Sequence, residues 1–365
     1  FLIFLPPLLY DAAFNMDVKQ FRTHFYTINT LAISLVFITA TGIAIVAHLM
    51  IPGMTWPTAF VLGSILSATD AVSAISITKG LGLSHKTTVI LEGESLVNDA
   101  SALIAYRFAV LAVTGTAFVF WKASLDFVIA IAGGLLIGVV IGRVLVFILK
   151  MIQQNTVVSI SFILLTPFVT YLMAEEFHVS GVIAVVMLGL SIGFFSNHLF
   201  TAQIRDQSKS FWDIIIFLLN GLIFILIGLQ FPYVASTISD GSIGTYIFYA
   251  FVITIVALLI RTGRVFFHQR QLTMGYRSKR GRVTEQALID VKTSIIISWS
   301  GMRGIVSLAT AIALPLNLKD GSPFPNRSEI VFISIVVVLC TIIGQGTTLP
   351  WLIKKLGSAD TTKAG

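Results

Sequence analysis

Eleven apolar runs, most of them about 20 residues long, follow one another along this chain of 365 residues. A helix of about 20 apolar residues matches the ~30 Å hydrocarbon core of a bilayer, so these runs predict membrane-spanning helices. Only 11% of the residues are charged and 56% are hydrophobic, whereas soluble domains carry about 25% charged residues. This balance excludes a soluble enzyme and a disordered chain, and the single cysteine, Cys340, excludes an internal disulfide. The runs are expected at 1–14, 29–51, 58–78, 87–114, 125–149, 157–174, 179–196, 211–231, 243–267, 293–314 and 329–356.

Basic residues are sorted to one side of this predicted topology. Most of the 24 Lys and Arg residues lie in or beside alternate links, and such an excess marks the cytoplasmic side. The exceptions are Lys122, Lys319 and Arg327 in the opposite links, and Arg107 and Arg303 within apolar runs. We therefore predict a multi-pass protein of the cell membrane with a cytoplasmic C-terminus. The net charge of +7 is interpreted as a topology signal, and the basic cluster at 270–282 as a lipid-facing anchor rather than a nucleic-acid site.

Acidic residues inside the apolar runs are the first candidates for function, because charge in hydrocarbon is costly and usually retained for a purpose. These acids are Asp11, Asp70, Glu92, Glu94 and Asp99. Glu92 is also compatible with a solvated helix end. Asp99 lies more than two turns into its run, and Ser95 shares its helix face because the two are four residues apart.

Two runs carry signs of an interrupted helix. Small and hydroxyl residues surround Thr69-Asp70 in the third run, and two glycines, Gly301 and Gly304, flank Arg303 in the tenth. Small residues alone indicate close helix packing, but they do not explain a mid-run carboxylate. Each interrupted run is the middle of three consecutive runs, and the two triplets run in opposite directions. Paired broken helices in inverted repeats are the best sequence indication of a secondary-transporter site.

The chemistry of such a site follows from its oxygen atoms. Na+, a hard cation, prefers oxygen ligands, and we predict that Asp99, Asp70, the Ser95 hydroxyl and the Thr69 carbonyl bind it. A carboxylate in a medium of low dielectric constant also binds protons more readily than one in water. Proton and cation then compete for Asp99, and an alternating-access carrier would exchange one for the other. An intramembrane Arg303 needs a carboxylate partner, and Glu94 is the first candidate and Asp11 the second.

Several segments resemble the Na+/H+ exchanger type of monovalent cation:proton antiporter, especially its bacterial branch. The run Gly93-Glu94-Ser95-Leu96-Val97-Asn98-Asp99-Ala100 matches the family signature Gly-Glu-Ser-Leu-x-Asn-Asp-Ala. Three further segments are similar to family segments, and in the second of them Ala71 stands where Pro is usual: Leu5-Pro6-Pro7, Thr69-Asp70-Ala71-Val72 and Gly301-Met302-Arg303-Gly304. A fourth similarity covers 222–228. The matches occur in the family's order along nearly the whole chain.

The resemblance implies an all-α inverted-repeat fold with two crossing discontinuous helices. It implies thirteen helices in the intact protein, with this chain beginning at the third. A transport core would comprise 29–115 and 243–356. A dimerisation scaffold would comprise 116–242 and an N-terminally incomplete 1–28, with a cytoplasmic tail at 357–365. The protein would be a homodimer.

The resemblance also implies an activity: exchange of Na+ or Li+ for H+ in pH homeostasis, with the ions as substrates and no cofactor. The neutral Asn98 favours an electroneutral one-for-one exchange. Glu94, Arg303, Asn98 and Asp11 would then be structural supports. A K+/H+ antiporter of the same fold stays open, followed by a cation channel and a membrane sensor. No metalloprotease motif, nucleophile–base pair or cofactor fingerprint favours an enzyme.

Overall fold

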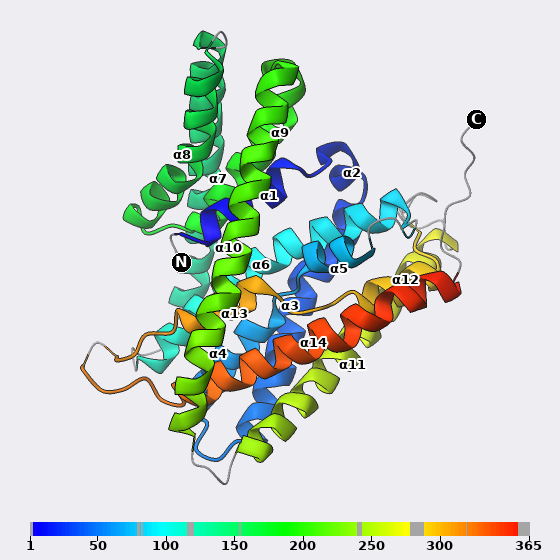
Figure 1. The fold of residues 1–365 in the computed structure, drawn as a ribbon. Helices are drawn as coiled ribbons and strands as arrows, with labels where there is room; N and C mark the ends of the chain where they lie inside the picture. The colour runs from blue at the N-terminus through cyan, green and yellow to red at the C-terminus, as the bar shows by residue number, and fades with distance from the viewer. Residues whose placement is uncertain are drawn as a thin grey trace. The chain divides into compact units, whose positions relative to one another are not determined.

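The computed structural model describes residues 3–78, 81, 83–114, 120–152, 155–238, 243–277, 288–318 and 320–356 (Figure 1). The described part contains 14 α-helices, so the expected all-α class is confirmed. Two of the predicted runs are each split into two helices, and one further helix, α2 (Val18–Thr23), has only six residues. If each split run is counted once and α2 is set aside, eleven segments remain, as the apolar runs predict. The expected tail at 357–365 lies outside the described residues.

One compact unit comprises 1–18 and 117–226. Its helices are α1 (Leu5–Phe14), α7 (Phe120–Met151), α8 (Thr156–Glu176), α9 (Gly181–Leu199) and the first part of α10 (Ala202–Thr237). Glycines of α7 pack directly on the backbone of α9: a Cβ at Gly138 would overlap the Ala184 carbonyl. Small residues of this kind let membrane helices approach closely.

The other unit comprises 19–116 and 227–365. Its helices are α2 (Val18–Thr23), α3 (Phe25–Met50), α4 (Trp56–Ser67), α5 (Ala71–Thr78), α6 (His85–Val113), the end of α10, α11 (Ile243–Arg277), α12 (Val291–Trp299), α13 (Ile305–Ile312) and α14 (Arg327–Leu356). Helix α3 contacts α4, α6 and α11, and α14 contacts both α12 and α13. The further assignment of the two units as scaffold and transport core stays a prediction.

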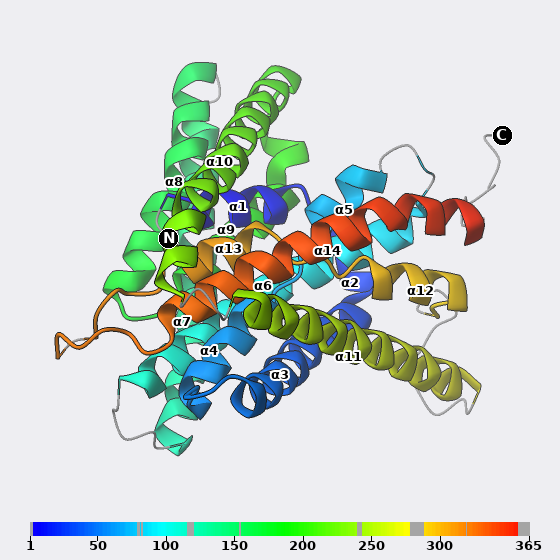
Figure 2. The ribbon, with the colours of Figure 1, turned by 60° about the horizontal axis from the view of Figure 1, so that its bottom comes forward.

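Two helices of the second unit are broken where the sequence predicts. Residues 68–70 separate α4 from α5, and residues 300–304 separate α12 from α13. Figure 2 shows the extended segment between α12 and α13. At Ala68 the backbone is extended, with ψ of 139°, and at Gly304 φ is −137° and ψ is −146°. Both breaks therefore release backbone groups that a continuous helix would bond internally.

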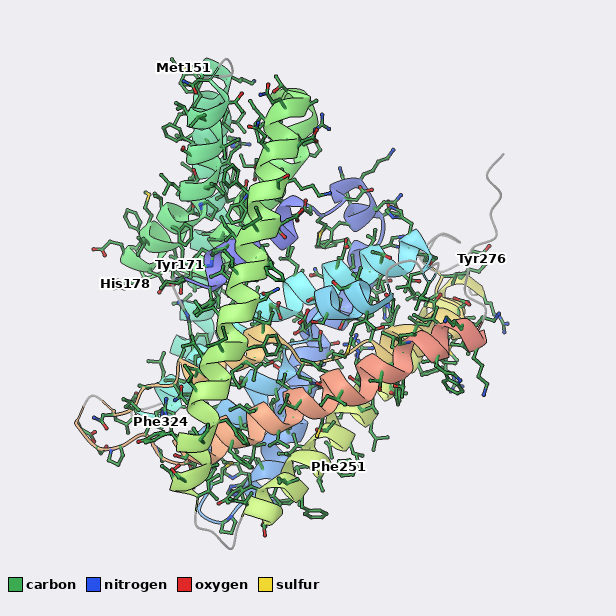
Figure 3. The ribbon with its side chains drawn as sticks, in the orientation of Figure 1. Met151, Tyr171, His178, Phe251, Tyr276 and Phe324 are labelled. Atoms are coloured by element: carbon green, nitrogen blue, oxygen red, sulfur yellow. The ribbon has the colours of Figure 1, made fainter. Side chains whose placement is uncertain are left out.

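The protein is a multi-pass membrane protein. Seven described helices are long and apolar enough to cross a bilayer: α3, α6, 128–151 of α7, α8, α10, α11 and α14. Large apolar side chains are exposed on them, such as Met151 (74% exposed) and Phe251 (55%), which are labelled in Figure 3. Such exposure is unfavourable in water but favourable against lipid tails, so these faces suit a bilayer.

Candidate ion-binding site

Asp70 ends the first break by capping α5. Its Oδ1 accepts a hydrogen bond from the Ser73 backbone N–H (3.0 Å), and its Oδ2 accepts one from the Ser73 hydroxyl (2.6 Å). A carboxylate at this position satisfies an unpaired N–H and interacts favourably with the positive end of the helix dipole. The predicted interruption at Thr69-Asp70 thus has a local cause in the capping side chain.

The two breaks are joined to each other. The Asp70 N–H donates to the Met302 carbonyl at 2.8 Å, so backbone groups released by one break satisfy the other. The Asp70 carboxylate also lies against Gly304, where an added Cβ would overlap it. Gly304 is the N-cap of α13, so Asp70 lies at the N-terminal ends of both α5 and α13.

Arg303 lies near the C-terminal ends of the other two half-helices, α4 and α12. Its Nε donates to the Leu66 carbonyl in the last turn of α4 (3.0 Å), and its Nη1 donates to the Gly301 carbonyl (2.7 Å). A cation beside these carbonyls offsets the negative end of a helix dipole. The second break is anchored further, because the Arg303 N–H donates to the Thr341 hydroxyl of α14 (3.1 Å).

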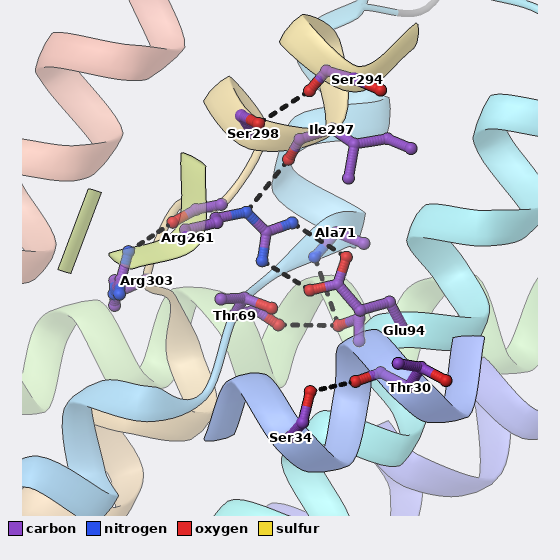
Figure 4. A network of polar contacts seen from close by, with 12 residues as sticks. Thr30, Ser34, Thr69, Ala71, Glu94, Arg261, Ser294, Ile297, Ser298 and Arg303 are labelled. Atoms are coloured by element: carbon purple, nitrogen blue, oxygen red, sulfur yellow. Dashed lines mark hydrogen bonds and ion pairs between the residues drawn. The ribbon is translucent and has the colours of Figure 1, made fainter. Parts of the chain in front are cut away.

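Helix α6 brings the signature residues to the first break. The Ser95 hydroxyl donates to the Thr69 carbonyl at 2.8 Å and accepts from the Ala71 N–H at 3.3 Å (Figure 4). Three of the four predicted cation ligands therefore lie at the first break: Thr69 and Asp70 within it, and Ser95 hydrogen-bonded to Thr69.

Asp99, the fourth predicted ligand, lies one helical turn beyond Ser95 on α6. Its Oδ1 is buried and, within the described part of the chain, accepts no hydrogen bond. The carboxylates of Asp70 and Glu94 lie within electrostatic range of it. Both polar atoms of the fully buried Asn98 are likewise without a partner among the described residues. Buried polar atoms are rarely left unsatisfied in proteins, so Asp99 and Asn98 are candidates to bind an ion or water.

The predicted pairing of Glu94 with Arg303 is wrong. Glu94 instead forms a two-pronged ion pair with Arg261 of α11, with Nη1–Oε1 at 2.5 Å and Nη2–Oε2 at 2.9 Å (Figure 4). Arg261 Nε also donates to the Ile297 carbonyl of α12 (3.0 Å), and both side chains are at most 2% exposed. The Nε and Nη1 groups of Arg303 donate to carbonyl oxygens instead.

The sequence interpretation missed Arg261 because it assigned this residue to the basic cytoplasmic links. A signal was present, since Arg261 falls inside the apolar run 243–267. Asp11, the second candidate partner for Arg303, lies in the other unit, where Asn15 Nδ2 donates to its Oδ1 at 2.8 Å.

The break at residue 70 forms although Ala71 replaces the helix-breaking proline of the family pattern. Asp70 caps the start of α5, and its N–H is bonded to Met302 and not to a carbonyl of α4. Alanine also keeps an N–H at this position, and that N–H is bonded to Ser95.

Crossed broken helices, with a carboxylate at one pair of helix ends and an arginine at the other, define the class as a secondary transporter. The backbone matches that of the sodium proton antiporter MjNhaP1 from Methanocaldococcus jannaschii, with a TM-score of 0.69 over 97% of this chain and 84% of that one, at 18% identity. The model of the sodium/hydrogen exchanger transmembrane region matches residues 1–355. The chain therefore belongs to the sodium/hydrogen exchanger family, a transporter family and not a family of enzymes.

Curated relatives agree with this membership. The chain is 35% identical to the "Sodium, potassium, lithium and rubidium/H(+) antiporter" of Bacillus pumilus, over 97% of this chain and 54% of the relative. It is 33% identical to the Na(+)/H(+) antiporter ApNhaP of Aphanothece halophytica, over 97% of this chain and 64% of the relative. The chain thus spans about half the length of the Bacillus protein and about two thirds of ApNhaP.

Proposed function

We propose that this protein exchanges Na+ or Li+ for protons across the membrane by alternating access, with cation and proton competing for Asp99. The observation that carries the proposal is the buried, unpartnered Oδ1 of Asp99 on the same α6 face as the Ser95 hydroxyl. Family membership and the named activities of the relatives support it.

The remaining ligands suit a hard cation. Ser95 Oγ and the Thr69 carbonyl each retain a lone pair after the hydrogen bond between them, and Asp70 adds negative charge. When the cation leaves, Asp99 takes up a proton instead, because an ionised, unpaired carboxylate is costly to carry through hydrocarbon. The empty and ionised carrier is thus trapped, and the exchange is coupled.

We further propose that the exchange is electroneutral, one proton per cation. Asn98, beside Asp99, is a neutral amide and has no acidic proton to exchange, and the Asp70 carboxylate is held by the Ser73 N–H and hydroxyl. The Glu94 carboxylate is held by Arg261 and serves as a support between α6 and α11. We also propose a homodimer with cytoplasmic C-termini, on the strength of the family resemblance and the sorted basic residues.

Potassium is the second candidate cation, because the relative in Bacillus pumilus is named for sodium, potassium, lithium and rubidium. The selectivity test is to reconstitute the protein in liposomes that contain a pH dye, impose a proton gradient, and add Na+, Li+ or K+ in turn. The wild type is expected to dissipate the gradient with Na+ and Li+. Dissipation with K+ alone would replace the sodium proposal with the potassium one.

Asp99→Asn tests the role of the carboxylate in the same liposomes. The amide has the same shape but cannot ionise, so exchange should fall to the level of empty liposomes while the protein still folds. Asp320→Asn is the control, because Asp320 is exposed in the link between α13 and α14 and its substitution should leave exchange unchanged. Wild-type exchange by Asp99→Asn would end the proposal. A current carried by the wild type without proton exchange would indicate a channel.

A further inference from the structure

The Ser95 hydroxyl is held in an unusual way for a serine within a helix. Serines in helices commonly donate to the carbonyl four residues before them. In this structure Ser101 does so to Val97 (2.8 Å), and Ser298 does so to Ser294 (2.7 Å). Ser95 donates instead to Thr69, across to another helix (2.8 Å). Some other interaction must favour this rotamer over the local bond.

The Ala71 N–H supplies that interaction. It donates to Ser95 Oγ at 3.3 Å, and Ser95 is 8% exposed, so the bond is sheltered from water. A hydroxyl has one proton and two lone pairs. The Ser95 hydroxyl donates its proton to the Thr69 carbonyl and accepts from the Ala71 N–H with one lone pair, so one lone pair is left over. The two bonds together fix the side-chain torsion and the direction of the hydroxyl.

We propose that the Ala71 backbone amide is the positioning group that holds the Ser95 hydroxyl in place as a cation ligand. The inference rests on the proposed function, because it assigns a purpose to Ser95 in that site. Without this amide, the hydroxyl turns to the carbonyl of Leu91 in its own helix, as those of Ser101 and Ser298 do to theirs. The cation then loses one ordered oxygen and the neighbouring Thr69 carbonyl loses its fixed partner.

Ala71→Pro removes the amide N–H. Ala71 is the first residue of α5, a position that suits proline because its N–H is not part of the helix hydrogen-bond ladder. The preceding Asp70 is outside the helix, so the restriction that proline places on it is tolerated. Proline removes the N–H and puts its Cδ in the same place, so the Ser95 hydroxyl must leave.

The test measures apparent KM and maximal rate for Na+ in proteoliposomes. The apparent KM should rise about three- to tenfold in Ala71→Pro, the equivalent of one hydrogen bond, while the maximal rate changes by less than about twofold. Ala71→Gly keeps the N–H and is the control, and its apparent KM should stay near that of the wild type. An unchanged or lowered KM in Ala71→Pro overturns the inference.

A double-mutant cycle with Ser95→Ala separates positioning from general damage. If Ala71 acts through the hydroxyl, Ala71→Pro should have no further effect on KM once that hydroxyl is absent. An equal rise in KM in both backgrounds contradicts the inference, because it shows that proline acts by some other route.

Binding gives a readout that does not depend on transport. A bound cation stabilises the folded state, so the melting temperature of the detergent-solubilised protein should rise with Na+ concentration. Ala71→Pro should need about three- to tenfold more Na+ for the same rise. If the wild type binds Na+ but exchanges no protons, the proposed exchange fails while the inference about Ala71 is still decided by this measurement.

Discussion

At Gly304, the hydrogen side chain allows the two breaks to meet. A methyl group there would overlap the Asp70 carboxylate, which is already held by Ser73. Gly304→Ala is therefore expected to separate the breaks and to lower Na+-dependent exchange at least tenfold. The matched control is Gly344→Ala on α14, where an added Cβ meets no atom within 4 Å. Equal activity of the two variants in proteoliposomes would show that the Asp70–Gly304 contact is not needed.

The Glu94–Arg261 ion pair is buried, and two hydrogen bonds join its two side chains. Removing one partner of a buried pair leaves an uncompensated charge and costs about 3–5 kcal/mol. Glu94→Gln and Arg261→Gln should each lower the melting temperature strongly, and Arg261→Gln more, since it also loses the Ile297 carbonyl.

The double variant Glu94→Gln/Arg261→Gln is the control for this pair. It should be less destabilised than the sum of the two single variants, because neither charge is then left alone. Thermal unfolding in detergent measures all three, and purely additive losses would contradict a coupled pair.

At the level of whole helices, the sequence was enough to predict the apolar helices and the positions of the two breaks. It was not enough to predict which helices pack against each other. The bilayer imposes a length on every apolar run, and a mid-run Asp70 or the Gly301–Gly304 stretch is conspicuous against that background. Which charges meet depends on which helices lie side by side. Glu94 and Arg261 are 167 residues apart, and no periodicity within either helix indicates the other. The carbonyl partners of Arg303 were equally hidden, because backbone groups exposed by a break depend on its exact conformation.

The short half-helix α12 depends on its N-cap. Asp290 accepts from the Thr293 N–H (3.2 Å) at the start of a nine-residue helix that holds the Ile297 carbonyl opposite Arg261. Asp290→Ala should destabilise the protein by about 1 kcal/mol, and Asp290→Ser, which can still cap, by less. Thermal unfolding of the two variants compares them directly. Equal losses would mean that capping is not what Asp290 contributes.

For the whole molecule, electroneutrality is the main expectation. One Na+ for one H+ moves no net charge, so the initial exchange rate in K+-loaded liposomes should be the same with and without valinomycin. The measurement uses a pH dye inside the vesicles and a voltage dye outside. An exchange that slows when the membrane potential is not clamped would show that more than one proton moves per cation.

The pH dependence of the apparent KM for Na+ tests competition at one carboxylate most directly. If a proton and a cation exclude each other at Asp99, the apparent KM should rise by about tenfold per pH unit on the acid side, where the empty site is protonated. It should level off on the alkaline side, and the maximal rate at saturating Na+ should stay nearly constant when the pH is equal on both sides. An apparent KM that does not change with pH, together with a maximal rate that falls in acid, would contradict the account.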